Sequence, residues 1–171
     1  MTLGELPKVS EKGFTLMEAM IALLILAAML LIAVPSFNAI RLSANLTALA
    51  NEVVSSVQFA RSEAIKNNGV VRMCVSDDGN SCAVTGGFSN GWLVQDSQNR
   101  RLMYFSAASG KGYKVSASGG IRTLVFYPSG LGATTATFTI CRQDPLGREQ
   151  RQVVVGPTGG TRVTRTEASS C

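Results

Sequence analysis

The first pattern along the chain is an uninterrupted apolar run over residues 14–34, with Glu18 as its single charge. A helix rises about 1.5 Å per residue, so these 21 residues reach roughly 31 Å, about one hydrocarbon thickness of a bilayer. Because backbone polar groups in lipid must bond within their own segment, a helix is the form that fits. We therefore predict a transmembrane helix over residues 14–34.

The second pattern, over residues 35–68, is an apolar stripe on a continuing helix that recurs every three or four positions. Pro35 predicts a kink, because proline lacks an amide donor and clashes with the preceding turn. The sequence Asn67-Asn68-Gly69 favours a left-handed helix end. We expect this amphipathic half to pack against the rest of the protein. The stripe consists of Leu46, Leu49, Val53, Val57, Ala60 and Ala64.

The third pattern, from residue 69 onward, is a series of segments rich in β-branched and aromatic residues, separated by glycine-rich turns. We predict α+β: a long N-terminal helix, transmembrane in its first half, packed on a C-terminal antiparallel β-domain of residues 69–171. Pro157–Gly160 and the end of the chain are expected to be loosely held. The predicted strands are Val70–Val75, Trp92–Gln95, Leu102–Phe105, Ile121–Tyr127, Thr135–Arg142 and Gln152–Val155.

The composition of the chain excludes several classes of function. The 171 residues carry a net charge of +5 without any run of like charges, which favours a solvated basic surface over a nucleic-acid patch. The chain has no histidine, so the usual general base is missing. It also lacks a nucleophile elbow, a phosphate-binding loop and an HExxH zinc motif. We predict that it is not an enzyme and needs no metal or cofactor.

Charges flanking the apolar run indicate its direction. Lys8 and Lys12 precede the run and Arg41 is the first positive charge after it, which places the N-terminus in the cytoplasm. A cleaved secretory signal fits poorly, because the run is too long and residues 32–35 make a poor cleavage site. A plain membrane anchor explains the run but not Glu18, since an acid at the bilayer centre costs about 2.5–3.5 kcal/mol.

The residues around Glu18 resemble the class III leader of type IV prepilins. A charged leader ends in Gly13, Phe14 follows, and Glu18 and Pro35 are then residues 18 − 13 = 5 and 35 − 13 = 22 of the mature chain. The resemblance implies that residues 1–13 are a leader peptide. It implies that a prepilin peptidase cuts after Gly13 and methylates the amine of Phe14. Glu18 of one subunit would then neutralise that amine on a neighbouring subunit inside lipid.

A second resemblance covers most of the remaining chain. Arg61-Ser62-Glu63-Ala64 is its sharpest piece, which we interpret as the last helical turn packing on the sheet. The ordered blocks resemble the GspH/FimT family, which contains minor pilins and the minor pseudopilin of type II secretion. The blocks read FARSEAIKNNGVVRMCV (59–75), GWLVQD (91–96), LVFYPSG (124–130) and RQVVVGPTGGTR (151–162).

The four cysteines, Cys74, Cys82, Cys141 and Cys171, all lie on the side of the membrane assigned to the periplasm, where disulfides persist. Four cysteines allow three pairings. We favour Cys74–Cys82, which closes a short loop, and Cys141–Cys171, which tethers the C-terminus. Metal binding is the weaker alternative, because histidine and CxxC motifs are absent. The acids of residues 77–80 within the first loop are better explained by a turn than by calcium.

Some FimT-like pilins bind DNA through a C-terminal GRxR motif. Here the matching stretch, residues 159–162, reads GGTR, so the first arginine is missing. Arg162 and Arg165 are three residues apart, which places them on opposite faces of an extended strand. One phosphate contact gives weak, salt-sensitive binding. We therefore do not expect nucleic acid as a partner, and DNA uptake is the weaker alternative.

Together these observations predict a minor pilin of a type IV pilus. It would be a structural subunit of a minor-pilin complex that primes pilus assembly and sits near the tip. Its partners would be other minor and major pilins, the prepilin peptidase and the inner membrane. We expect a single-pass inner-membrane protein with a periplasmic C-terminal domain that later enters the filament. The alternatives are a type II secretion minor pseudopilin, a DNA-uptake pilin and a plain membrane anchor.

Overall fold

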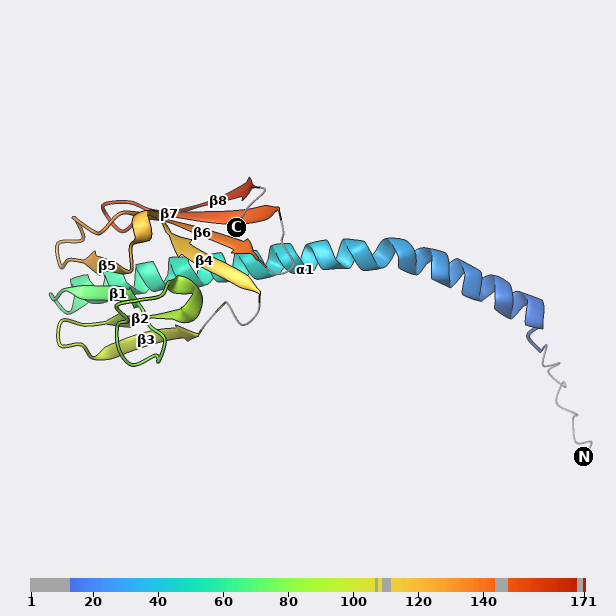
Figure 1. Ribbon diagram of the computed structural model, residues 1–171, viewed down its shortest axis with the longest axis horizontal. Helices are drawn as coiled ribbons and strands as arrows, with labels where there is room; N and C mark the ends of the chain where they lie inside the picture. Colours follow the sequence, from blue (N-terminus) through green and yellow to red (C-terminus); the bar gives the residue numbers. More distant parts are fainter. Residues whose placement is uncertain (1–12, 107, 109–111, 144–147, 169–170) are drawn as a thin grey trace, which may run out of the picture. The chain divides into compact units, whose positions relative to one another are not determined.

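The computed structural model describes residues 13–106, 108, 112–143, 148–168 and 171, and within its helix it leaves out the side chains of residues 32–36, 38 and 39. Internal contacts divide the chain into two compact units, residues 1–40 and 41–171. The described residues form one long α-helix followed by eight β-strands (Figure 1). The α+β prediction is confirmed.

Helix α1, Leu16–Lys66, contributes to both units. In the second unit its apolar stripe is the side that is buried, as predicted, although Leu49 is half-buried and Ala50 joins the stripe. The helix ends as its sequence predicts: Asn68 takes a positive φ of 46°, and the Gly69 amide donates to the Ala64 carbonyl at 3.1 Å. Pro35 lies inside α1. The kink stays a prediction.

The β-domain consists of two antiparallel four-stranded sheets (Figure 1). Sheet A has the order β3-β2-β1-β5 and sheet B the order β4-β6-β7-β8. The strands of sheet A are β1 (Val71–Val75), β2 (Gly91–Gln95), β3 (Arg101–Ser106) and β5 (Thr123–Phe126). Those of sheet B are β4 (Tyr113–Ala117), β6 (Ala136–Arg142), β7 (Glu149–Val155) and β8 (Thr161–Glu167).

Six of these strands match predicted segments, and two were missed. Strand β4 reads YKVSA and β8 reads TRVTRTE, so polar residues interrupt both and neither has an apolar run. Strand β8 is an edge strand, and edges favour such polar residues because they discourage pairing with other chains. The expectation of a loosely held chain end is therefore wrong for Thr161–Glu167, which pairs with β7 along its whole length.

The core of the second unit lies where α1 and both sheets meet. Phe88, in the short 3₁₀ helix η1 (Phe88–Asn90), packs edge-on against Phe138 of sheet B at a centroid distance of 4.9 Å. Its ring also lies 6.3 Å from that of Trp92 of sheet A, so one side chain links the two sheets. The indole Nε1–H of Trp92 donates to Ser56 Oγ of α1 at 2.8 Å. This hydrogen bond fixes the position of α1 relative to sheet A.

Candidate assembly site

The predicted processing site lies just before α1 begins. Gly13 and Phe14 are outside the helix and exposed, with 73% of Phe14 accessible. Thr15 caps the helix: its Oγ1 accepts the Glu18 amide hydrogen at 3.2 Å, and its carbonyl accepts the first helical bond from Ala19 at 3.1 Å. This arrangement leaves the peptide bond after Gly13 in non-helical backbone. Lys8, Lys12 and the rest of the predicted leader lie outside the described residues.

Glu18 occupies the third position of the first helical turn, and its side chain is exposed. Threonine as N-cap with glutamate three residues later is the capping-box sequence. A carboxylate there also interacts favourably with the positive end of the helix dipole. The carboxylate is thus placed close to the chain position where cleavage would create an amine.

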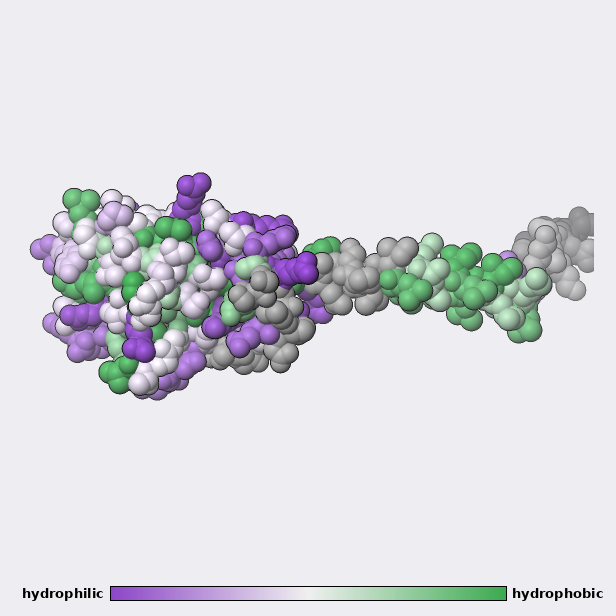
Figure 2. All heavy atoms as spheres, turned by 45° about the horizontal axis from the view of Figure 1, so that its top comes forward, coloured by the Kyte–Doolittle hydropathy of each residue, from purple (hydrophilic) through white to green (hydrophobic). Residues whose placement is uncertain are grey.

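The exposed apolar residues of the first unit occupy positions on all sides of the helix, and Figure 2 shows one face of this apolar surface. A helix that is hydrophobic all round needs an apolar environment or partners. Within the part of the chain that the structure describes, however, no helix meets the length and hydropathy expected of a membrane-crossing segment. Residues 32–34 of the predicted span are among those whose side chains are not described. The transmembrane prediction for residues 14–34 therefore stays a prediction.

A charged cluster ties α1 to sheet B. Arg151, only 8% exposed, forms an ion pair with Glu149 and donates from Nη2 to Ser43 Oγ at 3.0 Å and to Thr47 Oγ1 at 3.3 Å. Ser43 in turn donates to Glu149 Oε1 at 3.0 Å. Arg165 of β8 lies 3.4 Å from the same oxygen. Burial alone would raise the pKa of the Glu149 carboxyl, but these hydrogen bonds and positive charges outweigh it and hold that pKa below its usual value.

Sequence reasoning missed this cluster, although a signal for it exists. In a strand, every second side chain lies on one face. Glu149 and Arg151 therefore share a face with Val153 and Val155, which are core residues. That alternation places two charges on the helix-facing side of β7, where they need partners.

Both favoured disulfides are present: Cys74–Cys82 and Cys141–Cys171, each with Cα atoms 5.6 Å apart. The first closes the loop after β1, where Asp78 Oδ1 accepts the amide hydrogens of Asn80 and Ser81 at 2.8 and 2.9 Å. These backbone hydrogen bonds hold the pKa of Asp78 far below its usual range. Asp78 thus serves a turn, as the sequence indicates, while Asp77 accepts a hydrogen bond from Asn90 Nδ2 at 2.8 Å.

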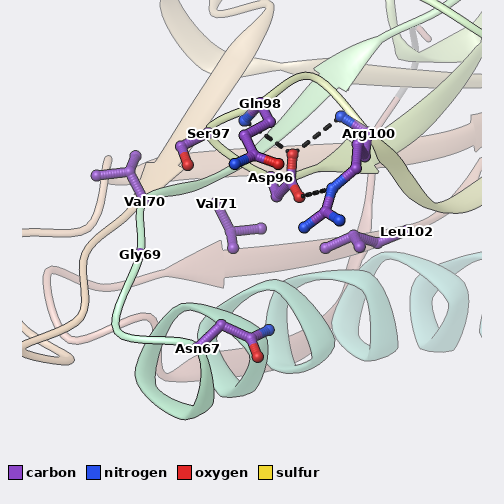
Figure 3. A pocket seen from close by; sticks show the side chains of 9 residues that line it. All are labelled: Asn67, Gly69, Val70, Val71, Asp96, Ser97, Gln98, Arg100 and Leu102. Atoms are coloured by element: carbon purple, nitrogen blue, oxygen red, sulfur yellow. Dashed lines mark hydrogen bonds and ion pairs between the residues drawn. The ribbon is translucent and has the colours of Figure 1, made fainter.

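A pocket of about 230 Å³ opens beside the end of α1 and the turn between β2 and β3 (Figure 3). Its two charges are already satisfied, because Asp96 accepts from the amides of Gln98 and Arg100 and from Arg100 Nε at 2.7 Å. The backbone hydrogen bond from Arg100, which outweighs the effect of burial, helps to hold the pKa of Asp96 below its usual value. The pocket therefore offers no unpaired charge to a ligand.

The two arginines considered for DNA binding both lie on β8. Arg162 pairs in register with Val154, and Arg165 with Arg151. Strand alternation places them on opposite faces, and Arg165 is engaged with Glu149. This geometry does not form a phosphate track.

Solved structures share this fold. Two crystal forms of the type IV minor pilin FimU of Pseudomonas aeruginosa strain PAO1 match with TM-scores of 0.56 and 0.57 at 19% and 18% identity. They cover 74% and 75% of this chain and 99% and 96% of their own chains. The minor pseudopilin EpsH of the Vibrio cholerae type 2 secretion system matches at 0.51 and 14% identity, over 70% of this chain and 95% of its own. The fold is that of pilin-like subunits.

Family models take the assignment one step further. A model of the prokaryotic N-terminal methylation motif matches residues 8–34. A model described as type II transport protein GspH matches residues 49–159, well over half of the chain. The chain therefore belongs to the GspH family. No individually curated protein matches it.

Proposed function

We propose that this chain is a minor pilin of a type IV pilus, most like FimU, and acts as a structural subunit without enzymatic activity. The observation that carries the proposal is one chain holding both an N-terminal methylation motif and a GspH domain with the FimU-like fold. A prepilin peptidase cuts after Gly13 and methylates Phe14. The apolar helix then holds the protein in the inner membrane, with the β-domain in the periplasm, until it joins a filament.

Assembly proceeds through helix packing. The exposed apolar side chains of the first unit, costly in water, become buried among the helices of neighbouring subunits. Glu18 pairs with the Phe14 amine of an adjacent subunit, because each charge alone is costly in an apolar environment and the pair is tolerated. The complex of minor pilins primes the pilus and stays near its tip.

The experiment is a deletion of the gene in its native host, complemented by the wild-type gene. Loss of surface pili and twitching motility, with protein secretion unchanged, is the expected result. Loss of secretion with intact twitching would contradict the pilus assignment and favour the second candidate, a type II secretion minor pseudopilin. That candidate is supported by the EpsH likeness and by the family's own description.

A further inference from the structure

Arg61, on the last turns of α1, carries a charge that the fold does not neutralise. Its Nε is buried and has no hydrogen-bond partner, and none of the ion pairs among the described residues includes it. Glu63, two residues further along the helix, instead forms an ion pair with Lys66 at 3.6 Å and accepts a hydrogen bond from the Asn67 side-chain Nδ2 at 2.7 Å. A buried guanidinium N–H without an acceptor is unfavourable in the isolated subunit.

Two glycine turns lie close to the Arg61 side chain. A Cβ built at Gly159 would lie 3.1 Å from Arg61 Cδ, and one built at Gly130 would lie 3.8 Å from Arg61 Nη2. Both glycines have positive φ, 72° and 70°, which side-chain-bearing residues rarely adopt. The stem of the arginine therefore lies along one turn, while the end of its guanidinium reaches the surface loop between β5 and β6.

Exposed apolar residues lie beside the Gly130 turn that this guanidinium reaches. Ile65, 48% exposed, follows Arg61 by one helical turn, and its Cδ1 lies 3.3 Å from a Cβ built at Gly130. Leu131, the residue after Gly130, is 61% exposed. Tyr127, which is 44% exposed, begins the turn, and its backbone carbonyl accepts the Gly130 amide hydrogen at 3.0 Å. We call Arg61, Ile65, Tyr127, Gly130 and Leu131 the Arg61 patch.

We propose that the Arg61 patch is a docking surface for the globular domain of another pilin subunit that presents a carboxylate beside an apolar side chain. Charge complementarity determines the occupant: the unpaired guanidinium needs an acid, and the apolar rim needs an apolar neighbour to exclude water. Arginine next to apolar contacts is the composition typical of interface hot spots. This inference rests on the proposed function, and it adds a contact between β-domains to the helix packing.

The test uses the full-length protein in its native host, with a photo-reactive amino acid at position 131 or, as control, at Val84, which is 86% exposed and lies outside the patch. Position 131 should crosslink to a subunit that carries the N-terminal methylation motif, at least about tenfold more than position 84. The crosslinked peptide should contain Asp or Glu. A crosslinked peptide without an acid, or equal crosslinking at position 84, would overturn the proposal.

Variants identify the role of the charge. Arg61→Met keeps the stem that packs beside Gly159 but removes the guanidinium, so crosslinking at position 131 should fall about tenfold. Arg61→Lys should retain part of it. Arg61→Glu, combined with an acid-to-arginine change in the crosslinked partner, should restore it. The exposed change Leu131→Ser, read by co-purification of the same partner, should weaken capture without affecting folding. Wild-type crosslinking in Arg61→Met, or wild-type capture in Leu131→Ser, would contradict the inference.

The outcomes separate this inference from the proposed function. If position 131 finds no pilin subunit although the wild-type protein enters filaments, the docking surface is wrong and the function stands. If the wild-type protein enters no filament and captures no pilin subunit, both are wrong.

Discussion

Trp92 is the chain's single tryptophan, and its indole lies completely buried with its N–H donated to Ser56 Oγ. Ser56 is itself fully buried, and its hydroxyl donates a hydrogen bond to the Glu52 carbonyl at 2.7 Å. A buried donor that loses its acceptor costs more than a hydrogen bond contributes. The stability of the β-domain therefore depends on a single atom of α1, the Ser56 hydroxyl oxygen.

Ser56→Ala should destabilise the full-length protein by about 1–3 kcal/mol, because the Trp92 N–H is left without an acceptor. Trp92 fluorescence during urea unfolding of the detergent-solubilised protein measures this directly. Ser55→Ala is the matched control: the neighbouring hydroxyl is exposed and bonds the same Glu52 carbonyl, at 3.0 Å. The control should change stability by less than about 0.5 kcal/mol. Equal effects of the two variants would show that the indole does not depend on Ser56.

Glu18→Ala should leave membrane insertion intact but lower incorporation into filaments by about tenfold or more, because the Phe14 amine of the neighbour loses its counter-charge. Quantitative immunoblots of membrane and sheared-pilus fractions measure both. Glu18→Asp, which keeps the charge, should retain more incorporation than Glu18→Gln. Normal incorporation of the alanine variant would remove the proposed role of Glu18.

At the scale of elements, the helix and the apolar strands could be predicted because their residues follow the periods of 3.6 and 2. Strands β4 and β8 could not, because their positions in sheet B come from pairing with β6 and β7 and not from an apolar run. The Arg151 cluster also escaped prediction, since its partners Ser43 and Thr47 are more than one hundred residues away in sequence. The alternation along β7 indicates that the two charges are buried, but a local pattern does not identify the distant residues that bind them.

The Glu149–Arg151 pair predicts how stability depends on pH. The pKa of Glu149 is lower in the folded than in the unfolded protein, so its contribution is complete above the unfolded value of about 4.3 and is lost as the pH falls through the folded pKa. Wild type should therefore lose more stability than Glu149→Gln between about pH 6 and pH 3. Asp78 and Asp96, whose pKa values are also lowered, are present in both proteins and cancel in the comparison. Parallel pH profiles would contradict this role of Glu149.

The two disulfides should differ in what they contribute. The Cys141–Cys171 bond spans 30 residues and the Cys74–Cys82 bond spans 8. Loop-closure entropy then gives about 3.6 and about 2.5 kcal/mol, respectively. Double replacement by serine should lower the urea midpoint more for the 141/171 pair than for the 74/82 pair. The reverse order would show that packing around Cys74, which is fully buried, outweighs chain entropy.

In the whole molecule, the sequence pattern predicts an apolar helix and a separate folded domain, and the structure also divides into two units. Residues 1–40 form one unit whose apolar helix has exposed side chains, and residues 41–171 form a second unit with its own core, two sheets and two disulfides. The N-terminal methylation motif could be predicted from Gly13, Phe14 and Glu18, because their spacing is fixed along the chain. The Arg61 patch could not, because it brings residues of α1 together with a loop some seventy positions later.

We propose that processing converts this chain into a subunit whose new amine and whose Glu18 direct assembly. Intact-mass and tandem mass spectrometry of the protein purified from its native host tests this most directly. We expect a mature chain that begins at Phe14, with a methyl group on its amine. A chain that still begins at Met1, or one that begins at an unmodified residue elsewhere, would contradict it.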